Sequence, residues 1–179
     1  MKSLKSISVA LLFVAAMSSM PAMAQAKSTP KLTDPEIASV AVVANQIDVE
    51  YAKIALMNSK NAATRKFAQT MIDDHTAIIA KAVALTKKLG VTPKDNAVSK
   101  SLMDGAKKMK MTLKNEKGAA FDKSYIDNEV KYHEAVIATI KDVLIPETQN
   151  AELKDLLKSV MPLLEHHLEM AKMEMENHK

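Results

Sequence analysis

The sequence contains no cysteine and no tryptophan. Without cysteine the chain has no disulfide bond and no thiol for a lipid anchor, so its stability has to come from a packed core. Aromatic residues make up 3% of the chain, too few for the stacking surfaces on which nucleic acids usually bind. No segment after residue 24 approaches the roughly 20 apolar residues of a membrane-spanning helix. We therefore expect a soluble mature protein with no nucleic-acid partner and no transmembrane segment.

Alanine, leucine, isoleucine, valine and methionine are abundant instead, and this composition is typical of helices packed on helices. At 179 residues the chain has room for one domain with a substantial hydrophobic core. The formal net charge of +4 falls to +2 when the first 24 residues, with two lysines and no acid, are removed. We predict a single all-α domain of nearly neutral charge.

The first 24 residues have the pattern of a signal peptide. Lys2 and Lys5 precede the apolar run 7–17, and Ala22-Met23-Ala24 is a small-x-small cleavage signature. We expect export of the chain to the periplasm, either free or associated with the outer membrane. Residues 25–33 are polar and are predicted to form a flexible leader, which leaves 34–179 as the folded domain.

Hydrophobic residues recur every three or four positions in five segments, as in amphipathic helices. We predict helices over about 34–59, 61–89, a shorter part of 91–119, 120–144, and 150 to near the C-terminus. Thr33 and Asn61 are expected N-caps, and Gly90 suits the left-handed position after a helix. Pro146 is expected to end the fourth helix, and Pro162 to kink the last one.

The connections predict an antiparallel four-helix bundle with an extra amphipathic helix. A short turn near residues 60–63 makes the first two long helices antiparallel neighbours, whereas the 91–119 link is long enough to cross from one end of a bundle to the other.

Five metal-capable side chains fall on the predicted apolar faces, when each helix is projected at about 100° per residue. They are Asp48, His75, Glu129, His133 and His167. Antiparallel packing of the first two long helices places Asp48 and His75 at nearly the same depth. Parallel packing of 61–89 and 120–144 also aligns His133, whereas His167 falls about one turn out of step.

Three histidines and a carboxylate form a plausible four-ligand site for a divalent transition metal such as Zn, Cu or Fe. Glu129 is a candidate fifth ligand, or a partner for the second ring nitrogen of a histidine. Asp74 lies at the edge of the same face, as an outer partner or a solvated side chain. The alternative is a buried hydrogen-bond network without metal, in which Asp48 and Glu129 accept hydrogen bonds from the histidines.

Two other metal sites fit the sequence less well. A di-iron oxidase uses a Glu from each of two helices and Glu-x-x-His from two others, but Glu129 and His133 are four residues apart and 61–89 contains no Glu. Thioether sulfur suits Cu(I), although a methionine-rich helix end is the simpler interpretation of the C-terminal tail. The tail residues in question are Met170, Met173, Met175, His166 and His178.

A combination of short motifs over roughly 34–172 resembles a family of bacterial exported proteins, catalogued as domain of unknown function 4142. The motifs are Phe67-Ala68, Met71 and Asp74-His75, then Phe121-Asp122, Tyr125 and His133, then Met161-Pro162, His167-Leu168 and Ala171. The resemblance implies a ferritin-like four-helix bundle in the periplasm or at the outer membrane, without an established activity.

The resemblance also implies a site. The family histidines correspond to His75, His133 and His167. The family's acidic residue, usually Glu, lies seven positions before an alanine, which here is Asp48 before Ala55. Glu129 stands where the family tends to have Met or Gln, so a role for Glu129 would be particular to this chain.

We expect an exported ferritin-like bundle that binds a transition metal in a metal-handling or envelope-stress role, without catalysis. The alternative is a non-enzymatic structural or interaction protein of the cell envelope, whose histidines only build the core.

Overall fold

A computed structural model describes residues 31–177, and these residues form helices and no strand. The predicted signal peptide lies outside them, as does all but the end of the predicted leader. The elements are α1 (Asp34–Asn58), α2 (Ala62–Leu89), α3 (Ala97–Asn115), α4 (Gly118–Thr139), the π-helical turn η1 (Ile140–Leu144), the short α5 (Ile145–Glu147) and α6 (Ala151–Glu176). The extra helix predicted within 91–119 is therefore present as α3.

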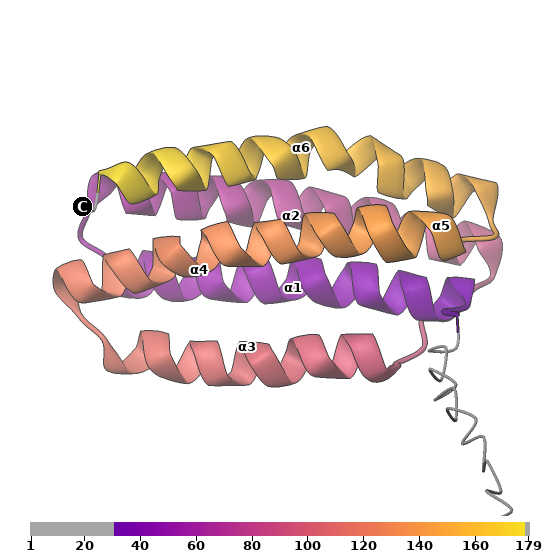
Figure 1. Cartoon of the computed structure of the whole chain (residues 1–179), viewed down its shortest axis with the longest axis horizontal. Coiled ribbons are helices and arrows are strands. Elements are labelled where there is room, and N and C mark those ends of the chain that lie inside the picture. Colours follow the sequence, from indigo (N-terminus) through magenta and orange to yellow (C-terminus); the bar gives the residue numbers. More distant parts are fainter. Residues whose placement is uncertain (1–30, 178–179) are drawn as a thin grey trace, which may run out of the picture. The chain divides into compact units, whose positions relative to one another are not determined.

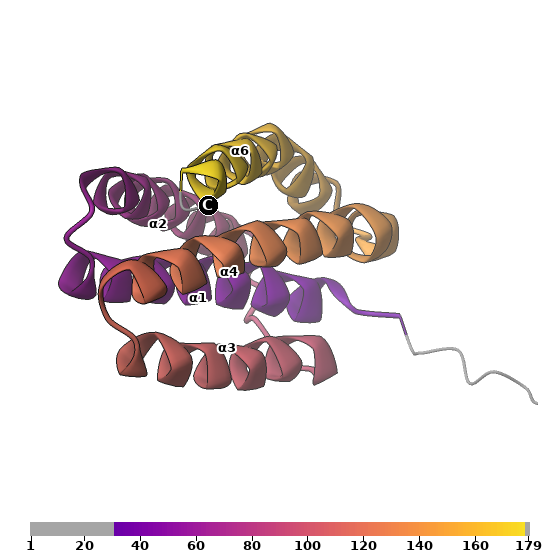
Figure 2. The ribbon, with the colours of Figure 1, turned by 60° about the vertical axis from the view of Figure 1, so that its left-hand side comes forward.

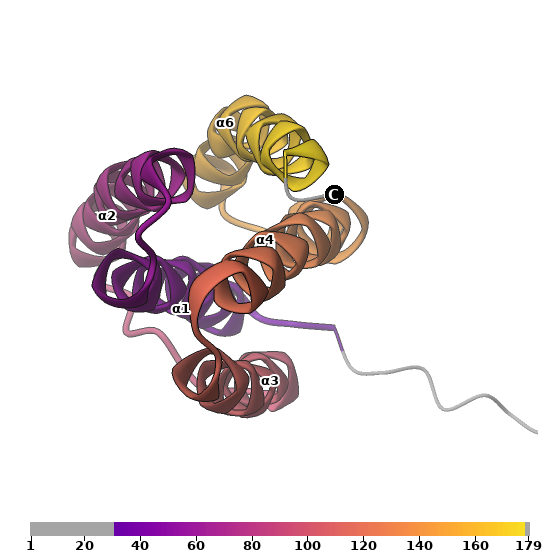
Figure 3. The ribbon, with the colours of Figure 1, turned by 90° about the vertical axis from the view of Figure 1, so that its left-hand side faces the viewer.

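The four long helices α1, α2, α4 and α6 lie side by side, and α3 lies against α1 and α4 on the outside (Figures 1, 2 and 3). Helices α1 and α6 run in one direction, and α2 and α4 run in the other (Figure 1). The link through α3 carries the chain back along the molecule, so that α4 starts at the same end as α2. Helices α2 and α4 are consequently parallel, the arrangement that aligns their central residues.

Local signals set the helix ends as the sequence predicts. Thr33 and Glu36 form a reciprocal capping box at the start of α1, and the Asn61 side chain accepts hydrogen bonds from the first turn of α2. Gly90 follows α2 with φ +64°, a left-handed conformation in which a side chain would be strained. The carboxylate of Asp34 accepts hydrogen bonds from the backbone N–H groups of residues 149 and 150, which joins α1 to the start of α6.

The prediction that Pro146 ends the fourth helix at residue 144 is wrong. The helix continues through η1 and ends at Glu147, and its first residue is Gly118 rather than Ala120. A proline ring clashes with the carbonyl four residues earlier in a regular α-helix. The wider π-helical turn just before Pro146, in which Ile145 N–H donates to Ile140 O, gives the ring room.

The other internal proline, Pro162, lies inside α6. The ribbon of α6 is bowed in Figure 1, as expected for a helix with a proline in its interior.

The apolar core has two parts, and a layer of buried polar side chains lies between them. One part contains Ile47, Tyr51, Phe67, Met71, Phe121, Tyr125 and Ala171 among others, and the second contains Ile37, Val40, Ile78, Ile140, Leu144, Leu157 and Leu164 among others. Along α2, for example, His75 lies between Met71 of the first part and Ile78 of the second. Because buried polar groups are costly without partners, this layer is where the structure departs from simple apolar packing.

Within residues 31–177, no helix is both long enough and apolar enough to cross a membrane.

Candidate metal centre

Each of the four long helices contributes to the polar layer at a similar depth. His75 lies at the middle of α2, and His133 lies at the middle of the continuous helix from Gly118 to Glu147. Asp48 and His167 lie in the second halves of α1 and α6, which run in the same direction. The extension of the fourth helix beyond residue 144 brings His167 to the depth of His133, although the helix bounds predicted from the sequence place these two residues about one turn apart.

All five predicted ligands meet in the interior. Their exposed fractions are 0% for Asp48, Glu129 and His167, 1% for His133 and 3% for His75. The three imidazole rings lie with centroids 5.1–5.6 Å apart. Oδ2 of Asp48 lies 3.4 Å from His75 Nε2 and 3.7 Å from His133 Nε2.

Hydrogen bonds on the outer side of the cluster fix the orientation of each histidine ring. His75 Nδ1–H donates to Asn45 Oδ1 at 2.7 Å, and His133 Nδ1–H donates to the backbone carbonyl of Glu129 at 3.0 Å. His167 Nε2–H donates to Asp74 Oδ2 at 2.9 Å. With one nitrogen acting as the donor, the second nitrogen of each neutral ring keeps its lone pair.

The second nitrogens are the ones that face the cluster without partners. His75 Nε2, His133 Nε2 and His167 Nδ1 are buried and make no hydrogen bond among the described residues. Metal-binding histidines commonly show this pattern, in which one nitrogen is held by a protein acceptor and the second is left for the ion.

The carboxyl groups of Asp48 and Glu129 also lack hydrogen-bond partners among the described residues. The carboxyl oxygens of Asp48 and Glu129 are buried, and none of them has a hydrogen-bond partner within residues 31–177. Burial raises the pKa of Asp48. Burial, followed by the neighbouring Asp48 charge, raises the pKa of Glu129, and the nearby Asn128 amide opposes that shift. The hydroxyl of Tyr125 is also buried without a hydrogen bond to the described residues, and burial raises its pKa as well.

The histidines are held in the neutral form. Burial, assisted by the neighbouring His133 and His167, lowers the pKa of His75 to about 2. Burial lowers the pKa of His133 to about 4, against the opposing hydrogen bond to the Glu129 carbonyl. Burial also lowers the pKa of His167, while Asp74 opposes that shift. Neutral imidazole is the form that binds a metal ion.

The ligand atoms form two overlapping groups, each able to hold an ion. His75, His133 and His167 form one group and Asp48, Glu129 and His133 the other, with ligand atoms in each group within 4.8 Å of one another. In a tetrahedral site, two ligand atoms that each lie about 2.1 Å from the ion are about 3.4 Å apart. A pair at the 4.8 Å limit of either group therefore has to approach by about 1.4 Å before both atoms bind one ion.

The sequence was compared with known protein families, curated proteins and solved structures. Residues 18–173 match the family model described as Domain of unknown function (DUF4142). The chain belongs to the DUF4142 family. No curated protein and no solved structure matches it.

For this DUF4142 protein the sequence identified the cluster but not all the groups that support it. Asn45, which fixes the His75 ring, was not predicted, although it lies one turn before Asp48 on the same face of α1. The sequence is compatible with Asp74 as an outer partner or as a solvated side chain, and the structure shows it as the partner of His167.

The di-iron site and the Cu(I) site in the C-terminal tail have less support. Among the described residues, the two ligand groups contain only two carboxylates, Asp48 and Glu129. A di-iron oxidase uses four. In the methionine-rich tail, Met170 and Met175 pack against the core and Met173 is 61% exposed. His166 is exposed, and His178 lies outside the described residues.

Proposed function

We propose that this protein is an exported, ferritin-like four-helix bundle that holds one divalent transition-metal ion in the cell envelope. The observation that carries the proposal is that three imidazole nitrogens and two carboxyl groups without hydrogen-bond partners among residues 31–177 converge in a buried layer. His75, His133, His167 and Asp48 are the ligands, with Glu129 beside them as a fifth ligand or a charge partner.

The fold class is supported by the arrangement of the helices. Two antiparallel pairs, α1 with α2 and α4 with α6, are joined by one long connection that runs through α3 (Figure 1). One long crossover between two antiparallel helix pairs is typical of ferritin-like bundles. The signal-like segment 1–24 supports export, to the periplasm or to the outer membrane.

Charge favours a divalent ion over a monovalent one. The three histidines are neutral, and once a cation displaces the protons that burial retains on Asp48 and Glu129, the two carboxylates carry a charge of −2 between them. A divalent cation cancels this charge inside a site with almost no exposure to water, where an uncompensated charge is very costly. Imidazole-rich ligand sets select Zn, Cu, Fe or Ni rather than Mg or Ca.

A metal-free network explains the cluster less well. In such a network the carboxylates would accept hydrogen bonds from the histidines. The contacts of Asp48 with His75 and His133 are 3.4 and 3.7 Å long and are not hydrogen bonds, and the inward histidine nitrogens have no partner among residues 31–177. Because unpaired buried polar groups are destabilising, the geometry supports a bound cation.

We infer a metal-handling or envelope-stress role instead of catalysis, because four or five protein ligands fill a tetrahedral or five-coordinate ion. Catalytic metal sites usually have three protein ligands and one open position.

The proposal is tested by calorimetric titration of the chelator-treated protein with Zn²⁺ or Co²⁺. We expect one equivalent to bind, and His167→Ala to lower the affinity by more than about 100-fold, the upper range for loss of an outer partner. His166→Ala is the matched control, because His166 is adjacent in α6 but exposed, and it should bind as the wild type does. Absence of binding in the wild type, or equal loss in both variants, would favour the structural role.

A further inference from the structure

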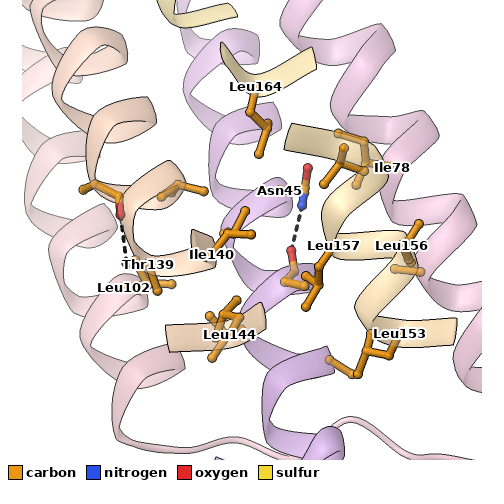
Figure 4. A pocket seen from close by; sticks show the side chains of 18 of the residues that line it. Asn45, Ile78, Leu102, Thr139, Ile140, Leu144, Leu153, Leu156, Leu157 and Leu164 are labelled. Carbon is orange, nitrogen blue, oxygen red and sulfur yellow. Dashed lines mark hydrogen bonds between the residues drawn. The ribbon is translucent and has the colours of Figure 1, made fainter. Parts of the chain in front are cut away.

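An apolar cavity lies in the second part of the core, next to the candidate metal centre. Its volume is about 80 Å³, and its walls come from α1, α2, α4, η1 and α6, with Leu102 of α3 (Figure 4). Ile78, Ile140, Leu144, Leu157 and Leu164 are among the side chains around it in Figure 4. The cavity has about half the volume of an engineered cavity of about 150 Å³ that admits benzene or xenon.

The polar groups that line the cavity are already bonded to the protein. Each of them donates to a backbone carbonyl: Asn45 to Ala41, Thr86 to Val83, Tyr132 to Ala44 and Thr139 to Ala135, at 2.8–3.0 Å. The Asn45 and Thr139 bonds are drawn in Figure 4, and Asn45 Oδ1 accepts from His75. A buried water needs two to four polar partners. The cavity therefore favours an apolar occupant over water.

A narrow hollow next to the cavity borders the metal-ligand cluster. This hollow, of about 10 Å³, is bounded by Asp48, His75 and His133. The two spaces share the lining residues Ala44, Asn45, Tyr132, Val136 and Leu164. A space of roughly 10–15 Å³ holds about one water-sized molecule, so the hollow beside the ligands has room only for a molecule of very few atoms.

On its other side the cavity adjoins an open groove between α3 and α4. The groove has a volume of about 550 Å³ and shares Leu102, Tyr132 and Ala135 with the cavity. Tyr132 lines all three spaces, and its hydroxyl is held by the carbonyl of Ala44. The groove, the cavity and the hollow are thus neighbouring spaces that lie in order from the surface to the cluster.

We propose that this apolar cavity binds a small, uncharged diatomic gas of the size and polarity of dioxygen and holds it next to the histidine–carboxylate cluster. The occupant is apolar because every polar side chain of the wall already donates a hydrogen bond to a backbone carbonyl, and it is diatomic because the neighbouring hollow has room for very few atoms. Its access to a metal ion rests on the proposed function, whereas its binding in the cavity does not.

The test uses metal-free full-length protein, in which gas binding is measured by NMR under dioxygen pressure with dioxygen itself as the probe. Dissolved dioxygen is paramagnetic and speeds the relaxation of nearby methyl groups. We expect the enhancement at Ile140 and Val136 to be several-fold larger than at Ile126, a buried residue of the first part of the core. Equal enhancement at all core methyls would overturn the proposal, and so would a water molecule detected in the cavity.

Two variants that fill the cavity distinguish gas bound in the cavity from gas that diffuses through the whole core. Leu157→Phe and Ala82→Leu place bulk in the cavity from α6 and from α2, and either variant that folds should lose the excess relaxation. Leu163→Phe is the matched control, because it makes the same exchange in α6 at a half-buried residue that does not line the cavity. In this variant the extra relaxation of the cavity methyl groups should remain. Persistence of the excess in a folded filling variant contradicts the proposal. Because the protein in this experiment is metal-free, that result would not contradict the metal-binding proposal, which is tested separately by the titration above.

Discussion

Each histidine in the cluster is positioned by an acceptor that belongs to another part of the chain or to the preceding turn. His75 is held by Asn45 of α1, His133 by the Glu129 carbonyl one turn earlier in α4, and His167 by Asp74 of α2. Outer partners of this kind fix ring orientation and tautomer, and their loss typically lowers metal affinity by about 10–100-fold.

The Asp74 contact gives a direct test of these outer partners. Asp74→Asn removes the charge that the His167 Nε2–H faces while keeping the shape of the side chain, so we expect the affinity for Zn²⁺ to fall by about 10–100-fold, measured by competition with a chelator. Asp73→Asn, a change of the exposed neighbour, should leave the affinity within about twofold of the wild type. Equal affinities of the two variants would show that Asp74 does not support the site.

The raised carboxyl pKa values predict that metal binding releases protons. Burial raises the pKa of both Asp48 and Glu129, so the metal-free protein retains protons there above the ordinary carboxyl pKa of about 4. A cation expels them, whereas His75 and His133, with pKa values lowered to about 2 and about 4, have none to give near neutral pH. Affinity should therefore rise with pH above about 4 and become constant above the raised pKa values.

Calorimetry in buffers of different ionisation enthalpy measures this release, and Glu129→Gln should lower the number of protons released. An affinity independent of pH between about 5 and 7, with no proton release, would contradict the assignment.

At the scale of the helices, two glycines of similar surroundings predict opposite effects of the same substitution. Gly90 has φ +64°, whereas Gly105 lies within α3 at a helical position, and a Cβ at either glycine meets nothing within 4 Å. Gly90→Ala should destabilise the protein by about 1 kcal/mol because of backbone strain. Gly105→Ala should stabilise it by about 0.5–1 kcal/mol because alanine favours the helix.

Urea denaturation measures both changes in the free energy of unfolding. Destabilisation by Gly105→Ala would contradict the open surroundings found at that position.

Helix positions and inward faces could be predicted from the sequence because both depend on neighbours close in the chain. The caps at Thr33 and Asn61, the stop at Gly90 and the three-to-four spacing of apolar residues are all local signals. The π-helical turn before Pro146 was not predicted, since the same proline is compatible with a helix end or with a widened turn. The pairing of His75 with Asn45, and of His167 with Asp74, depends on how separate helices face each other.

At the scale of the whole molecule, the polar layer divides the core into two apolar parts. Every long helix contributes to this layer, so an ion bound there links α1, α2, α4 and α6 at mid-depth. The layer is therefore expected to affect the stability of the whole domain and not only its local structure.

This arrangement predicts a large stabilisation by metal. At a free metal concentration about 100 times the dissociation constant, a ligand that binds only the folded state adds about 2.7 kcal/mol to the free energy of unfolding. For a chain of this size the thermal midpoint should rise by about 5–10 °C, measured by circular dichroism with and without Zn²⁺. His75→Ala should abolish most of the rise. A wild-type midpoint that metal does not change would contradict a site at the centre of the fold.

The most direct test of the central claim is elemental analysis of the full-length protein, purified without chelator from its own host. The account predicts close to one equivalent of a divalent transition metal per chain, and loss of that metal from the His75→Ala/His133→Ala double variant. A metal-free protein whose stability equals that of the metal-treated sample would contradict the account.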